Sequence, residues 1–434
     1  LVLVAIAAGL ARASDPEVDM DGPTMIRHWG YPAEVVTATT SDGYILSMHR
    51  IPYGRSGPGE GEPCRPVVFM QHGLECDATN WYSNLPDESA AFIFADAGFD
   101  VWMGNSRGNT YSKDHVSINP SKEKFWEFSW DEMAQFDTEA MVNAVLQQTG
   151  QPYLYYIGHS QGTLTMFSKL SSDAIFGPKI KKFFALGPIG TVAHIKGMIP
   201  IMEQLFMPEL NLWYDIVGSG EFLPNSWLTN LIAKYLCGSM IGDIFCENLI
   251  FMIMGPEGAQ YNSTRTPVYM SKTPAGTSTQ NVMHWMQMVK AGTVTRFDYG
   301  SSRENKKHYG QSKPPVYDFT SLKTDTYLYW SDDDWLADPE DIQEYLLTSL
   351  NPNYVKQNNH LPHYNHMDFV WGLDAAFDIY HPIVDIIRDD LGGKVQCPSA
   401  GPNKKAVQQV QKVQVVENHP KNIRPVDIVL PLRF

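Results

Sequence analysis

The segment Gly158-His159-Ser160-Gln161-Gly162 has the G-x-S-x-G pattern, which can present a serine as a nucleophile. It follows an apolar run at residues 153–157, which predicts a strand, and precedes a helix-compatible stretch at residues 163–170. In a sharp turn from strand to helix, the flanking glycines avoid a Cβ clash and leave the serine exposed at the apex. An ordinary glycine-rich turn is the alternative interpretation, but this context favours Ser160 as a nucleophile.

A serine hydroxyl becomes a good nucleophile only when a base accepts its proton. Where a serine lies on such a turn, an acid and a histidine follow it in the chain, in that order. Three histidines lie late in this chain, at His360, His363 and His366. Their regular spacing could also suggest a metal site, but the segment contains Pro362 and no cysteine. We expect one catalytic histidine on a loop, two incidental histidines and no bound metal.

The acid that orients this histidine should follow a late strand. The apolar run at residues 326–330 predicts such a strand, and the segment after it contains Asp332, Asp333, Asp334 and Asp338. Each of these would more often be a solvated loop residue or a helix cap than a catalytic acid. Spacing alone therefore leaves the choice among the four aspartates open.

Acyl transfer to a serine also needs two backbone N–H groups aimed at the oxygen that develops negative charge. One should belong to Gln161, directly after the nucleophile, and the other to a loop after an early strand. The segment Gln71-His72-Gly73-Leu74 follows the apolar run at residues 66–70, so Leu74 is the candidate. We expect His72 to be a structural loop residue rather than a second base.

The elements that must position these residues can be predicted from short apolar runs. Residues 35–51 alternate between apolar and polar around Asp42-Gly43, which predicts a hairpin. Continuous apolar runs predict strands that are covered on both faces of a sheet, at residues 66–70, 99–103, 153–157, 183–186 and 326–330. Ser129-Trp130-Asp131-Glu132 is a capping-box pattern, and Gly150 could end the helix that it opens. The repetition of strand and helix predicts a mostly parallel α/β sheet.

This alternation stops between residues 187 and 308, where Met, Leu, Ile, Phe and Trp are abundant and no clear strand is expected. We interpret this region as a helical cap and lid inserted between two parts of the core, at 14–186 and 309–392. Most of its apolar side chains could simply fill its own core, whereas the functional interpretation is an inner face that contacts an apolar ligand. Residues 393–434 form a polar tail with no assigned role.

The formal net charge of −15 argues against a nucleic-acid partner, because phosphate binding needs clustered Lys and Arg. The apolar residues 1–10, followed by Ala11-Arg12-Ala13, predict a signal peptide at 1–13, truncated at its start. No segment is long and apolar enough to predict a transmembrane helix. The sequon at Asn262 is a candidate glycosylation site, and Cys237 and Cys246 could close a short loop. We therefore expect a protein of the secretory pathway.

The chain resembles the acid lipase family, to which gastric lipase and lysosomal acid lipase belong. The resemblance extends in order from about residue 20 to about residue 390. The matching segments are His28-Trp29-Gly30-Tyr31-Pro32, Asp42-Gly43-Tyr44-Ile45-Leu46, Arg50-Ile51-Pro52-Tyr53-Gly54, Gln71-His72-Gly73-Leu74, Gly104-Asn105-Ser106-Arg107-Gly108-Asn109, Gly158 with the four residues after it, Leu336-Ala337-Asp338-Pro339, and Tyr364-Asn365-His366-Met367-Asp368-Phe369.

This resemblance implies an α/β-hydrolase fold with a helical cap and a lipase that acts at a lipid–water interface. Its implied substrates are triacylglycerols or sterol esters, cleaved through an acyl-enzyme without a cofactor. It places the acid on Asp334 and the base on His366, and it implies that Cys237 and Cys246 form a disulfide. It also implies an extracellular or lysosomal location. The oligomeric state stays open.

Two alternative functions also remain open. One is an esterase for small esters, or a thioesterase, on the same fold. The other is a lipid-binding protein that does not catalyse a reaction.

Overall fold

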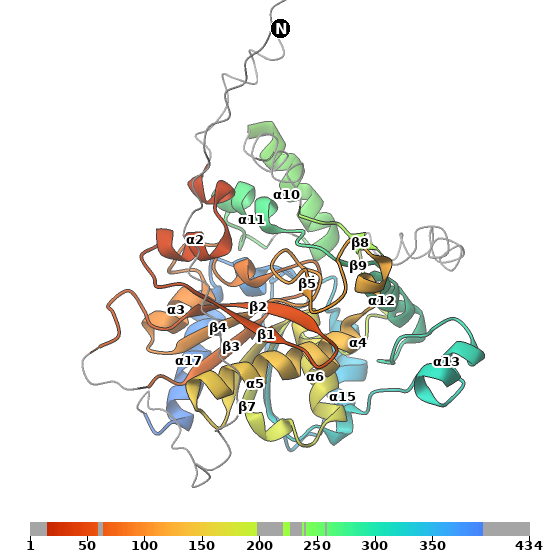
Figure 1. The fold of residues 1–434 in the computed structure, drawn as a ribbon. Coiled ribbons are helices and arrows are strands. Elements are labelled where there is room, and N and C mark those ends of the chain that lie inside the picture. The colour runs from red at the N-terminus through yellow and green to blue at the C-terminus, as the bar shows by residue number, and fades with distance from the viewer. Residues whose placement is uncertain are drawn as a thin grey trace, which may run out of the picture.

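The structure is a computed structural model that describes residues 15–59, 64–197, 220–225, 237, 240–256 and 258–393 (Figure 1). The predicted signal peptide and nearly all of the predicted tail lie outside these residues, as does much of the predicted cap between residues 198 and 239.

Within the described residues, the central sheet has nine strands in the order β1-β2-β4-β3-β6-β7-β10-β11, with β5 paired to β2. The strands are β1 (Glu34–Thr39), β2 (Tyr44–Ile51), β3 (Val67–Gln71), β4 (Asp100–Gly104), β5 (Asp114–His115), β6 (Leu154–His159), β7 (Ile180–Leu186), β10 (Asp325–Trp330) and β11 (Val355–His360). The pairs from β4 to β11 are parallel, whereas β2 pairs antiparallel with β1, β4 and β5. The predicted mostly parallel sheet is therefore confirmed.

Helices cover both faces of this sheet, as Figure 1 shows. The longer helices are α2 (Gly22–His28), α3 (Ala90–Asp96), α5 (Thr138–Thr149), α6 (Gln161–Ser172), α10 (Met240–Met254), α11 (Thr266–Lys272), α12 (Thr279–Ala291), α13 (Ser302–Tyr309) and α17 (His381–Asp390). The shorter helical segments include α4 (Trp130–Glu132), α14 (Pro339–Asp341), α15 (Leu347–Ser349) and α16 (Asp368–Trp371).

Alternate residues of the central strands enter two separate cores. Phe69, Tyr156 and Phe183 pack with α5 and α6 on one face, whereas Met70 and Ile157 pack with α3 and α17 on the other. Each of these strands is almost wholly buried, which explains why its sequence reads as a continuous apolar run.

Several local predictions agree with the structure. Gly43 lies in the turn between β1 and β2 with a φ of 103°, a conformation that a residue with a Cβ rarely adopts. Ser129 and Glu132 form the reciprocal capping box at the start of α4. A π-helical segment (Met133–Asp137) continues from α4 into α5, and Gly150 ends α5 in the left-handed conformation.

One strand was not predicted, and one prediction about strands was wrong. β11 (Val355–His360) was not predicted, and its last residue is His360, one of the two incidental histidines. Its sequence, VKQNNH, is polar because this edge strand is largely exposed, so it lacks the apolar signal of the other strands. Between residues 187 and 308 no strand was expected, yet β8 (Glu221–Phe222) pairs with β9 (Thr277–Ser278). Two-residue strands are too short to produce a recognisable pattern.

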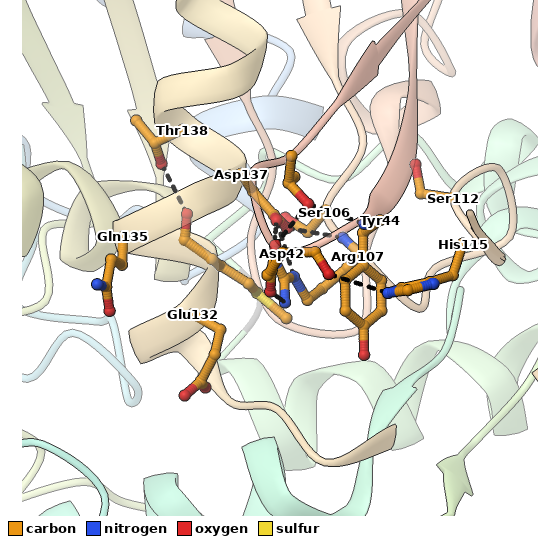
Figure 2. Close-up of polar contacts among 12 residues, drawn as sticks. Asp42, Tyr44, Ser106, Arg107, Ser112, His115, Glu132, Gln135, Asp137 and Thr138 are labelled. Atoms are coloured by element: carbon orange, nitrogen blue, oxygen red, sulfur yellow. Dashed lines mark hydrogen bonds and ion pairs between the residues drawn. The ribbon is translucent and has the colours of Figure 1, made fainter. Parts of the chain in front are cut away.

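A buried arginine joins three distant segments of the core (Figure 2). Arg107, in the loop after β4, donates from Nε to Asp137 at 2.8 Å and from Nη1 to Asp42 at 2.7 Å. Asp42 belongs to the β1–β2 turn and Asp137 ends the π-helical segment before α5. The guanidinium also lies 3.9 Å from the centre of the Tyr44 ring, a cation–π contact. The hairpin, the loop after β4 and the α4–α5 helical segment therefore depend on one charged side chain.

Burial raises the pKa of Asp137 to about 6, against the opposing effect of Arg107. We predict that Arg107→Leu lowers the free energy of unfolding at pH 7 by about 3–5 kcal/mol, because it leaves a buried carboxylate unpaired. The charged form of a group with a raised pKa costs stability above that pKa, and protonation removes the cost below it. Chemical denaturation should therefore show a smaller deficit at pH 5 than at pH 7.

A matched control is Lys307→Leu, which breaks an exposed ion pair with Glu304 and should cost about 0.5 kcal/mol or less. The double variant Arg107→Leu/Asp137→Asn should recover part of the loss. An equal deficit at both pH values, with no recovery in the double variant, would contradict this account of the cluster.

Candidate active site

Ser160 occupies the turn between β6 and α6, and its backbone is strained. Its φ of 52° and ψ of −122° are unusual for a residue that has a Cβ. The turn is held by a hydrogen bond from Ser160 N to Leu186 O of β7 at 3.0 Å. A strained serine between a buried strand and a helix is the geometry of a nucleophile elbow.

The two glycines that flank the serine allow the backbone to pack this tightly. A Cβ on Gly158 would lie 2.8 Å from Gly162 O, and a Cβ on Gly162 would lie 2.4 Å from Gln71 O. Carbon atoms do not approach backbone oxygen this closely, so both positions require glycine. The contact of Gly162 with Gln71 also brings the elbow against the loop that follows β3.

The loop after β3 lies directly beside the serine. A Cβ on Gly73 would be 2.9 Å from Ser160 Cβ. His72 braces this loop, because its Nδ1 donates to Gly73 O at 2.8 Å and its Nε2 accepts from Ser106 N at 3.1 Å. Burial lowers the pKa of His72 to about 4, which favours the neutral ring that this pairing requires. His72 thus has the structural contacts expected of a loop residue.

The backbone N–H groups of Leu74 and Gln161 are the two that the sequence predicts as hydrogen-bond donors to the oxyanion. Neither donates a hydrogen bond to another residue in the part of the chain that is described. The Gln161 side chain is fixed, since its Oε1 accepts from Asn281 Nδ2 at 3.0 Å and from Trp285 Nε1 at 2.7 Å. These two partners belong to α12, which therefore anchors the residue after the serine.

His366 and Asp334 form a buried pair. His366 Nδ1 lies 2.9 Å from both carboxylate oxygens of Asp334, and the two side chains are 2 % and 0 % exposed. Asp334 Oδ1 also accepts from Leu336 N at 2.9 Å and from Ala337 N at 2.8 Å. Because a carboxylate only accepts hydrogen bonds, the Nδ1 of His366 is the donor of this pair, and the Nε2 of the neutral ring carries the lone pair that a base needs.

His366 Nε2 is buried and has no hydrogen-bond partner among the described residues. No hydrogen bond joins it to Ser160 Oγ in the same part of the chain. Nucleophile–base hydrogen bonds are often long when no substrate is bound. The two residues are nevertheless neighbours, because His159 Nε2 contacts His366 O at 2.8 Å.

The other candidate histidines and aspartates pair away from the serine. His360 Nε2 lies 2.9 Å from Asp332 Oδ2, and His363 Nδ1 lies 3.1 Å from Asp333 Oδ2. These pairs are considerably more exposed than the His366–Asp334 pair. Asp338 instead caps α14, where its Oδ1 accepts from Glu340 N at 2.9 Å. Of these three His–Asp pairs, only His366–Asp334 is buried, and the other two lie nearer the surface.

Among the described residues, one group has the spacing of a metal site. It consists of His194, Glu340 and Glu344, whose ligand atoms lie within 4.8 Å of one another. All three are exposed and lie outside the serine site, and exposed acidic groups of this kind are common without a metal. We assign no metal chemistry to them.

Sequence reasoning missed the residues that brace the site from a distance. Asn281 and Trp285 hold Gln161, and neither belongs to a motif. His159 contacts His366, but it occupies a position of the G-x-S-x-G pattern at which the pattern specifies no residue. The spacing of Asn281 and Trp285, i and i+4, does place them on one helix face. That pattern could not reveal which residue they contact.

The structure also describes the candidate disulfide and the candidate glycosylation site. A disulfide joins Cys237 and Cys246, with 5.8 Å between their Cα atoms. Asn262 is partly exposed beside α11, and its Oδ1 accepts from Thr264 Oγ1 at 2.7 Å. Cys76 is buried and is not in a disulfide.

Comparison with known families gives two matches. Residues 23–85 match the family described as "Partial alpha/beta-hydrolase lipase region", and residues 66–209 match the "alpha/beta hydrolase fold" family.

Comparison with curated proteins gives long alignments. The chain is 55 % identical to lipase lipl-1 of Caenorhabditis elegans over 392 residues, which cover 90 % of this chain and 96 % of that protein. It is 42 % identical to the gastric triacylglycerol lipase of Homo sapiens, over 88 % of this chain and 94 % of that protein. It is 43 % identical to the lysosomal acid lipase/cholesteryl ester hydrolase of Homo sapiens, with the same coverage of 88 % and 94 %.

A solved structure from Sulfolobus solfataricus aligns with a TM-score of 0.51 and 13 % sequence identity, over 82 % of this chain and 99 % of that chain. This similarity concerns the fold alone.

The packing of the elbow generates a prediction about the serine's reactivity. Gly162→Ala places a Cβ against two backbone oxygens of the β3 loop, so the turn and the N–H of Gln161 must move. We expect the rate of covalent labelling by a fluorophosphonate probe to fall by about 100-fold or more, as for the loss of one oxyanion donor. The labelled residue can be mapped by mass spectrometry and should be Ser160.

Gly177→Ala is the matched control, because no atom lies within 4 Å of a Cβ at Gly177 and its φ is not positive. This variant should be labelled at the rate of the unchanged protein. Equal labelling of Gly162→Ala and Gly177→Ala would show that the tight turn is not needed for the serine's reactivity.

Proposed function

The chain belongs to the lipase family that includes gastric triacylglycerol lipase and lysosomal acid lipase, and we propose that Ser160, Asp334 and His366 are its catalytic residues. The acid lipase resemblance and the α/β-hydrolase fold predicted from the sequence are confirmed by these relatives. The protein is a hydrolase of carboxylic esters of neutral lipids. The observation that carries the assignment of residues is the buried Asp334–His366 pair beside a strained serine.

In this mechanism Ser160 Oγ attacks the ester carbonyl carbon and transfers its proton to His366 Nε2. A bond forms between Oγ and the carbonyl carbon, and the carbonyl oxygen becomes an oxyanion. Asp334 keeps the Nδ1–H of the imidazole in place and stabilises the ring once it is positively charged. Collapse of the intermediate breaks the bond to the alcohol, which leaves with the proton from Nε2. Water then hydrolyses the acyl-enzyme by the same steps.

We propose that the N–H groups of Leu74 and Gln161 bind the oxyanion. This assignment is supported by the contacts of the β3 loop with the elbow at Gly73 and Gly162. It is also supported by the observation that neither N–H group donates a hydrogen bond to another described residue. Such donors stabilise the transition state by about 3–4 kcal/mol each, because they are fixed before charge develops.

The substrates that we propose are triacylglycerols or sterol esters at a lipid–water interface. Two relatives are named for triacylglycerol and cholesteryl ester, which share a long apolar acyl group beside the reacting carbonyl. We propose that residues 187–308 form the cap that meets this acyl group. The core strands stop at the end of β7 and resume with β10, and α10 to α13 lie between them. No metal or organic cofactor takes part in the mechanism.

We propose that the protein is delivered through the secretory pathway to the cell exterior or to the lysosome. This proposal is supported by its gastric and lysosomal relatives, by the disulfide at Cys237–Cys246 and by the sequon at Asn262. Among the described residues, no helix combines the length and apolar character needed to cross a bilayer.

The catalytic proposal predicts that the purified protein hydrolyses triacylglycerol and cholesteryl ester emulsions. Ser160→Ala should lose this activity, and Asp334→Asn should lower kcat by about 10⁴-fold because the imidazole is no longer held in the required tautomer. Ser168→Ala changes another buried serine, which lies on α6, and should keep the activity. Release of fatty acid, titrated at constant pH, measures all three variants.

A series of esters with increasing acyl length distinguishes a lipase from an esterase for small substrates. A lipase should prefer long acyl chains presented as an emulsion. Full activity of Ser160→Ala would refute the proposed nucleophile, and preference for short soluble esters would refute the proposed substrate class.

The glycosylation proposal has its own test. Protein secreted from eukaryotic cells should decrease in mass after treatment with peptide N-glycosidase, and Asn262→Gln should remove this decrease because it lacks the acceptor nitrogen. Asn119→Gln, at an asparagine outside any sequon, is the control and should leave the decrease unchanged. An identical mass with and without the enzyme would contradict modification at Asn262.

A further inference from the structure

The backbone that carries His366 belongs to no helix or strand. His366 lies between β11, which ends at His360, and α16, which begins at Asp368. The hydrogen bond from His366 Nδ1–H to Asp334 fixes the imidazole ring but not the peptide to which the ring is attached. A ring at the end of an unsupported loop could rotate together with its partner, so other contacts must fix this peptide relative to Ser160.

Two hydrogen bonds hold the peptide groups of His366 from opposite directions. His366 N donates to Met254 O, the last residue of α10, at 3.1 Å. His366 O receives a hydrogen bond from His159 Nε2 at 2.8 Å. Because a carbonyl oxygen can only accept, His159 must carry its proton on Nε2. His159 is also the residue that immediately precedes Ser160, so this bond joins the loop of His366 directly to the elbow.

The surroundings of His159 favour a neutral imidazole that donates a hydrogen bond. Its side chain is 1 % exposed, and burial lowers its pKa well below the ordinary value for histidine. Its ring lies 4.8 Å from the ring of His366, centre to centre, where a second positive charge would oppose the charged form of His366. Its Nδ1 is buried and has no hydrogen-bond partner among the described residues. An unpaired buried acceptor costs free energy that an apolar side chain would avoid, so the Nε2–H donor must supply a compensating benefit.

We propose that His159 is a positioning residue that fixes the loop of His366 to the nucleophile elbow, so that His366 Nε2 is held within reach of Ser160 Oγ. This inference rests on the proposed function, in which His366 is the base. His159 neither contacts the substrate nor exchanges a proton. It acts through a single hydrogen bond to a backbone carbonyl, and it matters because displacement of a catalytic group by about 1 Å can cost about 100-fold in rate.

Three substitutions separate the donor from the bulk of the side chain. The amide nitrogen of glutamine can reach the place of Nε2, whereas that of asparagine reaches only the place of Nδ1 and leucine has no donor. We expect kcat for a soluble ester to fall by about 10- to 100-fold in His159→Leu and His159→Asn, with KM changed less than about twofold. His159→Gln should recover kcat to within about threefold of the unchanged protein. Fluorophosphonate labelling of Ser160 should follow the same order.

A purely structural histidine would not give this pattern. His49→Leu is the matched control, because His49 is also 1 % exposed and lies on β2, away from β6 in the sheet. Among the residues that the structure describes, its side chain has one hydrogen bond, to Tyr82. It should lower the melting temperature without the specific loss of kcat. If His159→Leu does not fold, the comparison of His159→Asn with His159→Gln still decides the question.

The proposal is overturned if folded His159→Asn or His159→Leu keeps the kcat of the unchanged protein, or if His159→Gln is as impaired as His159→Asn. Ser160→Ala separates this outcome from failure of the proposed function. An inactive Ser160→Ala with an unimpaired His159→Leu rejects only the positioning role, whereas an active Ser160→Ala rejects the catalytic assignment itself.

Discussion

The site depends on a carboxyl group that is buried in the interior of the protein and surrounded by hydrogen-bond donors. Asp334 is fully buried, and an isolated carboxylate would be very unfavourable there. Asp334 accepts hydrogen bonds from the N–H groups of Leu336 and Ala337 and from the Nδ1–H of His366. Because these donors come from two loops after β10 and β11, the pair can form only when the parallel strands place both loops at the same edge of the sheet.

The same edge of the sheet also supports the strain at Ser160. A non-glycine residue at positive φ is costly and persists only where its surroundings determine it. Here the bond from Ser160 N to Leu186 O holds one side of the turn, and the contact of Gly162 with the β3 loop holds the other. The same contacts bring the loop after β3, which carries Leu74, against Ser160. The strain at Ser160 and the contact between the elbow and the loop after β3 thus have a common origin in the packing of β3, β6 and β7.

The helices beyond the central sheet are connected to this edge by polar contacts as well as by packing. Met254 O, at the end of α10, accepts from His366 N, and Asn281 and Trp285 of α12 hold the Gln161 side chain. Rearrangement of α10 or α12 would therefore be transmitted to the imidazole and to the residue after the serine. The helical region between β7 and β10 is therefore in direct contact with the loop of His366 and with the residue after Ser160.

Features that depend on neighbouring residues could be predicted from the sequence: the elbow at Ser160, the capping box at Ser129, the Asp42-Gly43 turn and the apolar strands. Hydrophobic periodicity and backbone preference are local properties, so they can be recognised in the sequence alone. Spacing could not choose among four aspartates, and only the resemblance to a family singled out Asp334. The tertiary structure decided which aspartate is buried against His366, that the polar segment at residues 355–360 adds a strand, and that His159 contacts the loop of His366. These depend on contacts between residues up to about two hundred positions apart in the chain, which no local pattern encodes.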